Sequence, residues 1–443
     1  MSSDIMCSPS RLESLSPELL LCILKETHAD DLLTVIQTSP AMRRVFYQNE
    51  KTVCKTVIQK TIGMKLLPIA YALFDVATTS AKDEVKMNER TFHPMSSDIR
   101  YPLEVPGAEK HPLRYVRDDN FAMPTCDLKM ANTMGSFHVI VENLLPYLAL
   151  EDGQSDFNSI SSSVKERYIK AMYIFELSRL LKPRRPHLRN PWSLLWVWRT
   201  FSPWDAAGAE MVGNMVKRII AEQLKITPNY KKSIRFKLYA ECSKIFKKHN
   251  MKVTQVEQLQ LVSLHWGLDN INSVLHGNIV GLPKRFFNFV VNYVHSSKSE
   301  WYFPKSIGPM EDILWFIWLY RPQSGVLSEA KNILRVLEEY PDEDDSPRDF
   351  WLWYNVWMNS EPGSPIRMSH PAWLPIFGHG EWNASTRHFT RAYNVENFSQ
   401  HIFRDRPDAS SRWNFPSREK LVAELERMAI ADADAYADAD TDA

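Results

Sequence analysis

The chain has few cysteines, and none stands at a spacing typical of a metal site. The five cysteines in 443 residues are scattered, with no Cys-x-x-Cys pair: Cys7, Cys22, Cys54, Cys126 and Cys242. An odd number without paired spacings argues against a disulfide framework and against a zinc knuckle. Cys22 lies inside an apolar helical pattern, and we interpret it as a small buried hydrophobic residue. We therefore predict no metal site and no cofactor.

The chain also lacks an excess of charge, a signal sequence and a long apolar run. Lys plus Arg and Asp plus Glu are both 53, so the formal net charge is zero. A balanced charge favours neither a nucleic-acid binder nor a membrane-surface protein. The amino terminus is polar, and the apolar stretches are short or interrupted. We therefore expect a protein of the cytoplasm, the nucleus or both, with no membrane partner and without nucleic acid as its main partner.

Glycine is scarce, and alternating strand patterns are rare. Only 14 of the 443 residues are glycine, and apolar residues recur mostly at helical spacing, as in 135–150 and 168–180. Nothing repeats at a fixed period, which excludes leucine-rich, kelch and WD arrays. The sequence predicts an all-α protein, with an N-terminal three-helix unit followed by an irregular helical domain with long loops.

Composition divides the chain into four parts. We predict a small helical domain over 12–60, a trailing helix and Pro-rich linker over 61–130, and a helical, Trp-rich domain over 131–430. All 14 tryptophans lie after residue 190, and we interpret them as core packing in preference to a recognition pocket. In 431–443 Ala alternates with Asp, which predicts a disordered acidic tail because nothing there can pack.

A dense aliphatic pattern begins near the amino terminus. Ser16 is a suitable N-cap, and Pro17 stands at the first helical position, where proline is tolerated. A second short helix begins at Asp30 or Asp31, and Ser39-Pro40 opens a third. So small a hairpin cannot bury all its aliphatic side chains against itself, and the surplus must face the rest of the chain or another protein. These side chains are Leu15, Leu19, Leu20, Ile23, Leu24, Leu32 and Leu33.

Leu15 begins the pattern Leu-x-Pro-Glu-Leu-Leu-x-x-Ile-Leu, and Asp31-Leu32-Leu33 and Ser39-Pro40 follow it. Three helices in this order resemble an F-box in its fungal style. The continuation from Arg44 to Ala70 is similar to many fungal F-box proteins. In that family the three helices dock on a Skp-type adaptor, which bridges to a cullin-based ubiquitin ligase. A plain helical hairpin packed on the chain's own core remains the alternative.

The resemblance implies that the protein is a substrate receptor of a cullin ubiquitin ligase and does no chemistry itself. It would hold an unknown protein substrate near activated ubiquitin and so raise the effective concentration. The adaptor-binding residues that it implies are Leu15, Pro17, Leu19, Leu20, Ile23, Leu24, Leu32 and Leu33.

A basic segment over 225–252 offers a second candidate binding surface. It holds nine basic residues and a single acid, Glu241, with apolar residues interleaved. This pattern is typical of a helix with an apolar stripe and a basic face, which suits nucleic acid or an acidic partner. A solvated face near the acidic run 338–345 explains the pattern as well. The basic face comprises Lys231, Lys232, Arg235, Lys244 and Lys248.

No catalytic constellation is complete in the sequence. Gly208 and Gly213 have the spacing of a phosphate loop but lack the Lys-Ser/Thr that must follow. His370, His379 and His388 match no zinc signature. We predict no catalytic residues, and an unrecognised enzyme in the helical domain remains the third alternative.

Overall fold

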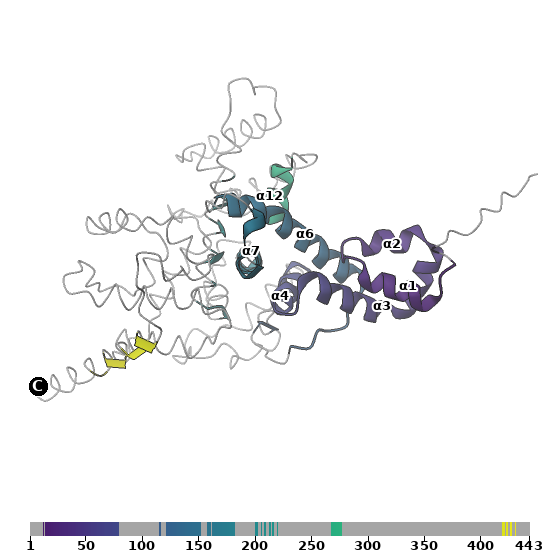
Figure 1. The fold of residues 1–443 in the computed structure, drawn as a ribbon, viewed down its shortest axis with the longest axis horizontal. Coiled ribbons are helices and arrows are strands. Elements are labelled where there is room, and N and C mark those ends of the chain that lie inside the picture. The colour runs from purple at the N-terminus through teal and green to yellow at the C-terminus, as the bar shows by residue number, and fades with distance from the viewer. Residues whose placement is uncertain are drawn as a thin grey trace, which may run out of the picture. The chain divides into compact units, whose positions relative to one another are not determined.

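The computed structural model describes the chain in separate stretches, which are helical (Figure 1). Helices make up 82% of the described residues and no strand occurs among them, which confirms the all-α class for this part of the chain. The chain divides into two compact units, Met1–Leu144 and Leu145–Ala443. The described residues are 12, 14–78, 115–116, 121–151, 157–160, 162–181, 200–202 and 267–276, with scattered positions in 205–219 and 419–430.

Three helices of the first unit begin where the sequence predicts. Helix α1 (Pro17–Glu26) starts at its proline, α2 (Leu32–Thr38) follows Asp31, and α3 (Pro40–Ile62) follows Ser39. The Ser39 hydroxyl accepts a hydrogen bond from the Met42 backbone N–H at 3.4 Å, so it caps the helix as its residue type favours.

Helix α3 is long and bends in its middle. Asn49 leaves the helical region with φ −128° and ψ 18°, and its side-chain amide donates to the Val45 carbonyl at 3.0 Å. A side chain that bonds to the preceding turn competes with the regular ladder, which accounts for the bend. The helix ends at Gly63, whose φ of 82° suits glycine.

Helices α1 and α2 pack on α3 and bury one face each. Leu24 and Leu32 have no exposed surface, and they meet a core to which α3 contributes Phe46 and Ile58, both also fully buried. Helix α4 (Leu67–Thr78) contacts the end of α3 and buries Leu67 and Leu73, among others. No single described helix has the length and apolar content of a membrane span; the bent pair α3 and α4, at 114°, reaches them only when taken together.

Helix α6 (Leu128–Glu151) begins seven residues before the predicted helix over 135–150. The Asp127 carboxylate accepts from the Met130 backbone N–H at 2.7 Å and caps its first turn. Glu50 of α3 accepts from the Leu128 backbone N–H at 3.2 Å, which ties the start of α6 to α3. The division between the two units falls at Leu144, inside this helix. The domain bounds that the sequence predicts stay a prediction.

The second unit has α7 (Ser162–Leu181) as its best described element, preceded by the 3-10 turn η4 (Phe157–Ser159). The helix predicted over 168–180 lies within α7, and residues 171–178 are all buried. Helix α12 (Leu268–Leu275) follows Gly267, which has a φ of 85°. Its first backbone N–H, from Leu268, donates at 3.1 Å to the buried carboxylate of Glu176, which suits the positive end of a helix.

Candidate docking surface on the N-terminal helices

The outward face of α1 carries part of the residue set that the sequence marks for partner binding. Leu19 is 53% exposed and Ile23 is 37% exposed, one helical turn apart. Pro17 is also exposed, while Leu15 and Leu33 are half-buried. These side chains lie where another molecule can reach them.

The other three residues of the set belong to the chain's own core. Leu20, Leu24 and Leu32 are 2%, 0% and 0% exposed. Because successive helical residues are 100° apart, Leu20 and Leu24 turn toward α3 when Leu19 and Ile23 face outward. The aliphatic pattern that reads as one face in the sequence therefore divides into an inner and an outer half.

Cys22 corrects one interpretation of the sequence. We predicted a small buried hydrophobic residue, but Cys22 is exposed and lies on the outward face between Leu19 and Ile23. The reason is again helical geometry, since position 22 points away from the face that holds Leu20 and Leu24. The outward face of α1, meaning Leu19, Cys22 and Ile23 with Pro17 at the start of the helix, thus presents apolar side chains beside the exposed carboxylates of Glu18 and Glu26.

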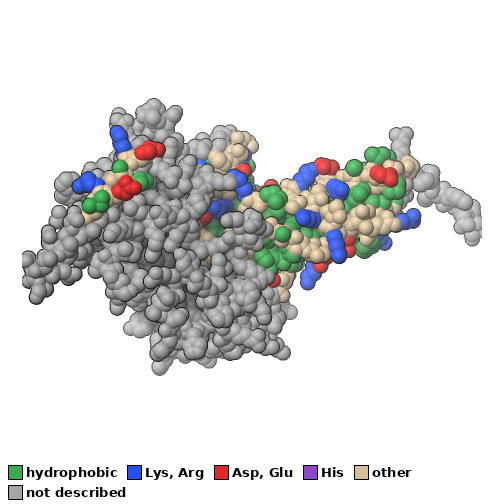
Figure 2. Space-filling model, turned by 90° about the horizontal axis from the view of Figure 1, so that it is seen from below, with side chains coloured by type: hydrophobic (Ala, Val, Ile, Leu, Met, Phe, Trp, Pro, Cys, Tyr) green, Lys and Arg blue, Asp and Glu red, His purple; other side chains and the backbone are tan. Residues whose placement is uncertain are grey.

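Other exposed apolar side chains of the first unit are isolated. Tyr47 and Met64 are 62% and 63% exposed, and the Tyr47 ring rests edge-on against Phe46 at 5.6 Å between centroids. Figure 2 shows hydrophobic side chains reaching the surface of these helices in several places among charged ones. Single exposed apolar residues are normal on proteins, whereas a cluster on one helix face is a candidate docking site.

Polar contacts fix the ends of α1 and α2. The backbone N–H of Glu18 and the hydroxyl of Ser16 hold the pKa of the Glu18 carboxyl below its usual value at the first turn of α1. Glu26 in the last turn forms an ion pair with Lys60 of α3. The guanidinium of Arg43 donates to the Ile36 carbonyl at 3.3 Å and closes the end of α2.

The loop between α1 and α2 is held from two sides. The Ala29 backbone N–H donates to the Thr61 hydroxyl of α3 at 3.2 Å, and Ala29 is fully buried. On the other side the loop lies so close to α6 that a Cβ added at Gly135 would come within 2.5 Å of the Ala29 Cβ. A glycine is therefore required at position 135 for this approach.

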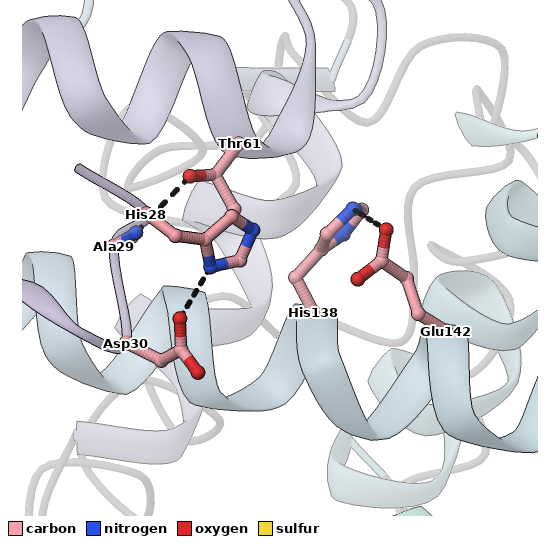
Figure 3. A network of polar contacts seen from close by, with 6 residues as sticks. All are labelled: His28, Ala29, Asp30, Thr61, His138 and Glu142. Carbon is pink, nitrogen blue, oxygen red and sulfur yellow. Dashed lines mark hydrogen bonds and ion pairs between the residues drawn. The ribbon is translucent and has the colours of Figure 1, made fainter. Parts of the chain in front are cut away.

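Two histidines meet at this contact. Figure 3 shows the His138 ring, which projects from α6, beside the His28 ring of the loop. His28 forms an ion pair with Asp30, and His138 Nε2 lies 3.8 Å from a carboxylate oxygen of Glu142. Burial, with a smaller contribution from His28, lowers the pKa of His138 to about 4. His138 is thus neutral at physiological pH. The sequence contained no local signal for this pairing.

The two buried thiols of the first unit are poor nucleophiles. Burial, together with the negative charge of Glu50, raises the pKa of Cys54 to about 12. Burial raises the pKa of Cys126 to about 11, although Lys55 partly opposes it. Since the thiolate is the reactive form, neither group is prepared for catalysis. Among the described residues, no group of three or more His, Cys, Asp or Glu side chains is placed to hold a metal ion.

Several predicted features lie outside the described residues, and their roles stay predictions. They are the basic face with Lys231, Lys232, Arg235, Lys244 and Lys248, the tryptophans, the histidines at 370–388 and the acidic tail.

No protein-family model, no curated protein and no solved structure matches this chain. What can be said of its class rests on its own described residues, which are all-α, with packed helices near the amino terminus and exposed apolar side chains on the first of them.

Proposed function

We propose that the protein is an F-box-type substrate receptor, which binds a Skp-type adaptor of a cullin ubiquitin ligase through the outward face of α1. The observation that carries the proposal is the exposure of Leu19, Cys22 and Ile23 on a helix whose Leu20 and Leu24 are buried. An apolar face that the chain leaves uncovered favours association with another protein. The order of the helices α1, α2 and α3 adds to this support.

The residues that the resemblance implies would have different roles in this proposal. Leu19 and Ile23 would make the contact, with Leu15, Pro17 and Leu33 at its edge. Leu20, Leu24 and Leu32 would build the platform, because they are already buried in the free chain. Covering the exposed parts of Leu19 and Ile23 would contribute about 1 kcal/mol each, roughly half the value for complete burial.

The proposed mechanism is recruitment and needs no catalytic residue in this chain. One part of the protein holds the adaptor, and the remainder holds a protein substrate, so that ubiquitin transfer proceeds at a high effective concentration. This role places the protein in the cytoplasm, the nucleus or both.

The test is co-purification of the full chain with a recombinant Skp-type adaptor. We expect wild type to retain the adaptor and the double variant Leu19→Asp, Ile23→Asp to lose it, since two carboxylates would be buried unpaired in the interface. The matched control is Tyr47→Asp with Met64→Asp, which places the same charges at exposed apolar positions away from the outward face. Failure of wild type to retain any adaptor would show the proposal to be wrong.

Substitution of Leu20 is a poor test of adaptor binding. Leu20 is 2% exposed, so an aspartate there would disrupt the core of the first unit and remove every function together. The exposed pair separates binding from folding, and circular dichroism of both double variants checks that they remain folded.

A further inference from the structure

The contact between the α1–α2 loop and α6 is tight and places a histidine inside it. Ala29 is fully buried, and the space above Gly135 is filled by Ala29 and by the Asp30 backbone nitrogen, 2.7 Å from where a Cβ would lie. His138 follows Gly135 by three residues on the same helix, so it stands on the same face. It is 4% exposed. The loop therefore closes over a side chain that can take up a proton.

The charged groups near His138 have opposing effects on its protonation, and the loss of hydration on burial makes the neutral ring the favoured form. His28 lies beside it from the loop and is paired with Asp30, and Glu142 stands one turn along α6 (Figure 3). From α3 the nearest contact to this loop is the uncharged Thr61 hydroxyl, while Lys60 is paired with Glu26.

Glu142 would favour a charged His138, but its side chain is 52% exposed and 3.8 Å away, so water screens it. Asp30 is paired with His28. Two neighbouring imidazolium ions would repel, and a buried cation loses its hydration. Protonation of His138 is therefore unfavourable while the loop is closed over it.

We propose that the His28–Asp30 loop and His138 form an acid-sensitive latch, in which protonation of His138 releases the loop from α6 and loosens the connection between α1 and α2. The latch is a property of this chain alone and does not depend on the proposed adaptor. Asp30 keeps His28 in place as an ion-pair partner, and the neutral His138 ring completes the closed contact.

The direction of the pH effect follows from the His138 pKa. Burial, with a smaller contribution from His28, lowers that pKa from its usual value of 6.5 to about 4. Because the pKa of His138 is lower in the closed state than in the open state, the closed state is fully stable above pH 6.5. It loses stability as the pH falls toward 4. Between about pH 7 and about pH 5 the equilibrium constant for closure should fall by about 20-fold, since one proton binds to the open state preferentially.

The first measurement is the titration of the histidine rings of the full-length protein by NMR, with His138 assigned by its loss in His138→Gln. We expect its titration to lie well below that of an exposed imidazole. A pKa of His138 near 6.5 would overturn the latch, because protonation of His138 would then leave the equilibrium between the closed and open loop unchanged.

The second measurement is amide hydrogen exchange of residues 28–31, corrected for the intrinsic effect of pH. In wild type we expect the protection of these amides to fall by about 20-fold between about pH 7 and about pH 5. In His138→Gln, whose side chain cannot be charged, we expect the protection to change far less. His276→Gln is the matched control, since the same substitution at an exposed histidine should leave the fall unchanged.

Should His138→Gln fail to fold, His28→Gln gives a second route. It removes one neighbouring charge and keeps the burial, so the His138 titration should move part of the way toward 6.5. Equal loss of protection with pH in wild type and His138→Gln, or no response of the His138 titration to His28→Gln, would contradict the proposal.

Discussion

Helices α1 and α7 are both rich in apolar residues, but they bury them to very different extents. In α7 the eight residues 171–178 are all buried, and even Glu176 is 6% exposed and bound to the start of α12. In the ten residues of α1 only Leu20 and Leu24 are buried. The comparison shows that α7 is buried within its own chain, whereas α1 presents apolar surface that the described part of the chain leaves uncovered.

The largest effect should come from emptying the core around α7. Phe175 is 1% exposed, so Phe175→Ala removes a full aromatic side chain and leaves a cavity. We expect the free energy of unfolding to fall by about 3–5 kcal/mol, with adaptor binding affected only through loss of folded protein. Thermal unfolding followed by circular dichroism measures this. A loss below about 1 kcal/mol would mean that α7 is not a core helix.

A sharper form of the comparison lies within α1 itself. Leu20→Ala should lower the free energy of unfolding by about 2–4 kcal/mol, because Leu20 is 2% exposed. Leu19→Ala, one residue earlier, should cost less than about 1 kcal/mol because Leu19 is 53% exposed. Denaturant unfolding of the two variants side by side gives the difference. Equal losses would show that the outer and inner halves of α1 are not distinct.

The sequence predicted where these helices begin because the signals are local. Pro17 and Ser39 act within one turn of the residues that they organise. The outward direction of Cys22 was missed because periodicity alone does not say which of two adjacent apolar stripes meets α3. The bend at Asn49 depends on the single hydrogen bond to Val45, which the hydrophobic pattern does not report.

The contact of Ala29 and His28 with Gly135 and His138 lay further beyond sequence reasoning. More than one hundred residues separate the two segments, so no periodic pattern relates them. Only Gly135 gave a sequence signal for this contact, because glycine inside a helix is unfavourable without a packing reason. The structure supplies that reason in the loop that rests on it.

Gly135→Ala tests this contact and should have a smaller effect. Helix propensity alone would stabilise α6 by about 1 kcal/mol, but the new Cβ would meet Ala29 at 2.5 Å. We expect a net loss of about 1–3 kcal/mol and faster amide exchange at 28–31. Gly63→Ala is the control, since nothing lies within 4 Å of its Cβ and only its φ of 82° is unfavourable. A stabilised Gly135→Ala protein would show that the loop does not rest on α6.

The most direct test of the account is the affinity of the purified full-length protein for a Skp-type adaptor, measured by titration calorimetry. The account predicts measurable binding by wild type, a loss of at least about tenfold in Leu19→Asp, Ile23→Asp, equivalent to about 1.4 kcal/mol or more, and wild-type affinity in Tyr47→Asp, Met64→Asp. Absence of binding by wild type, or an equal loss in both double variants, would contradict the claim that the outward face of α1 is the docking surface.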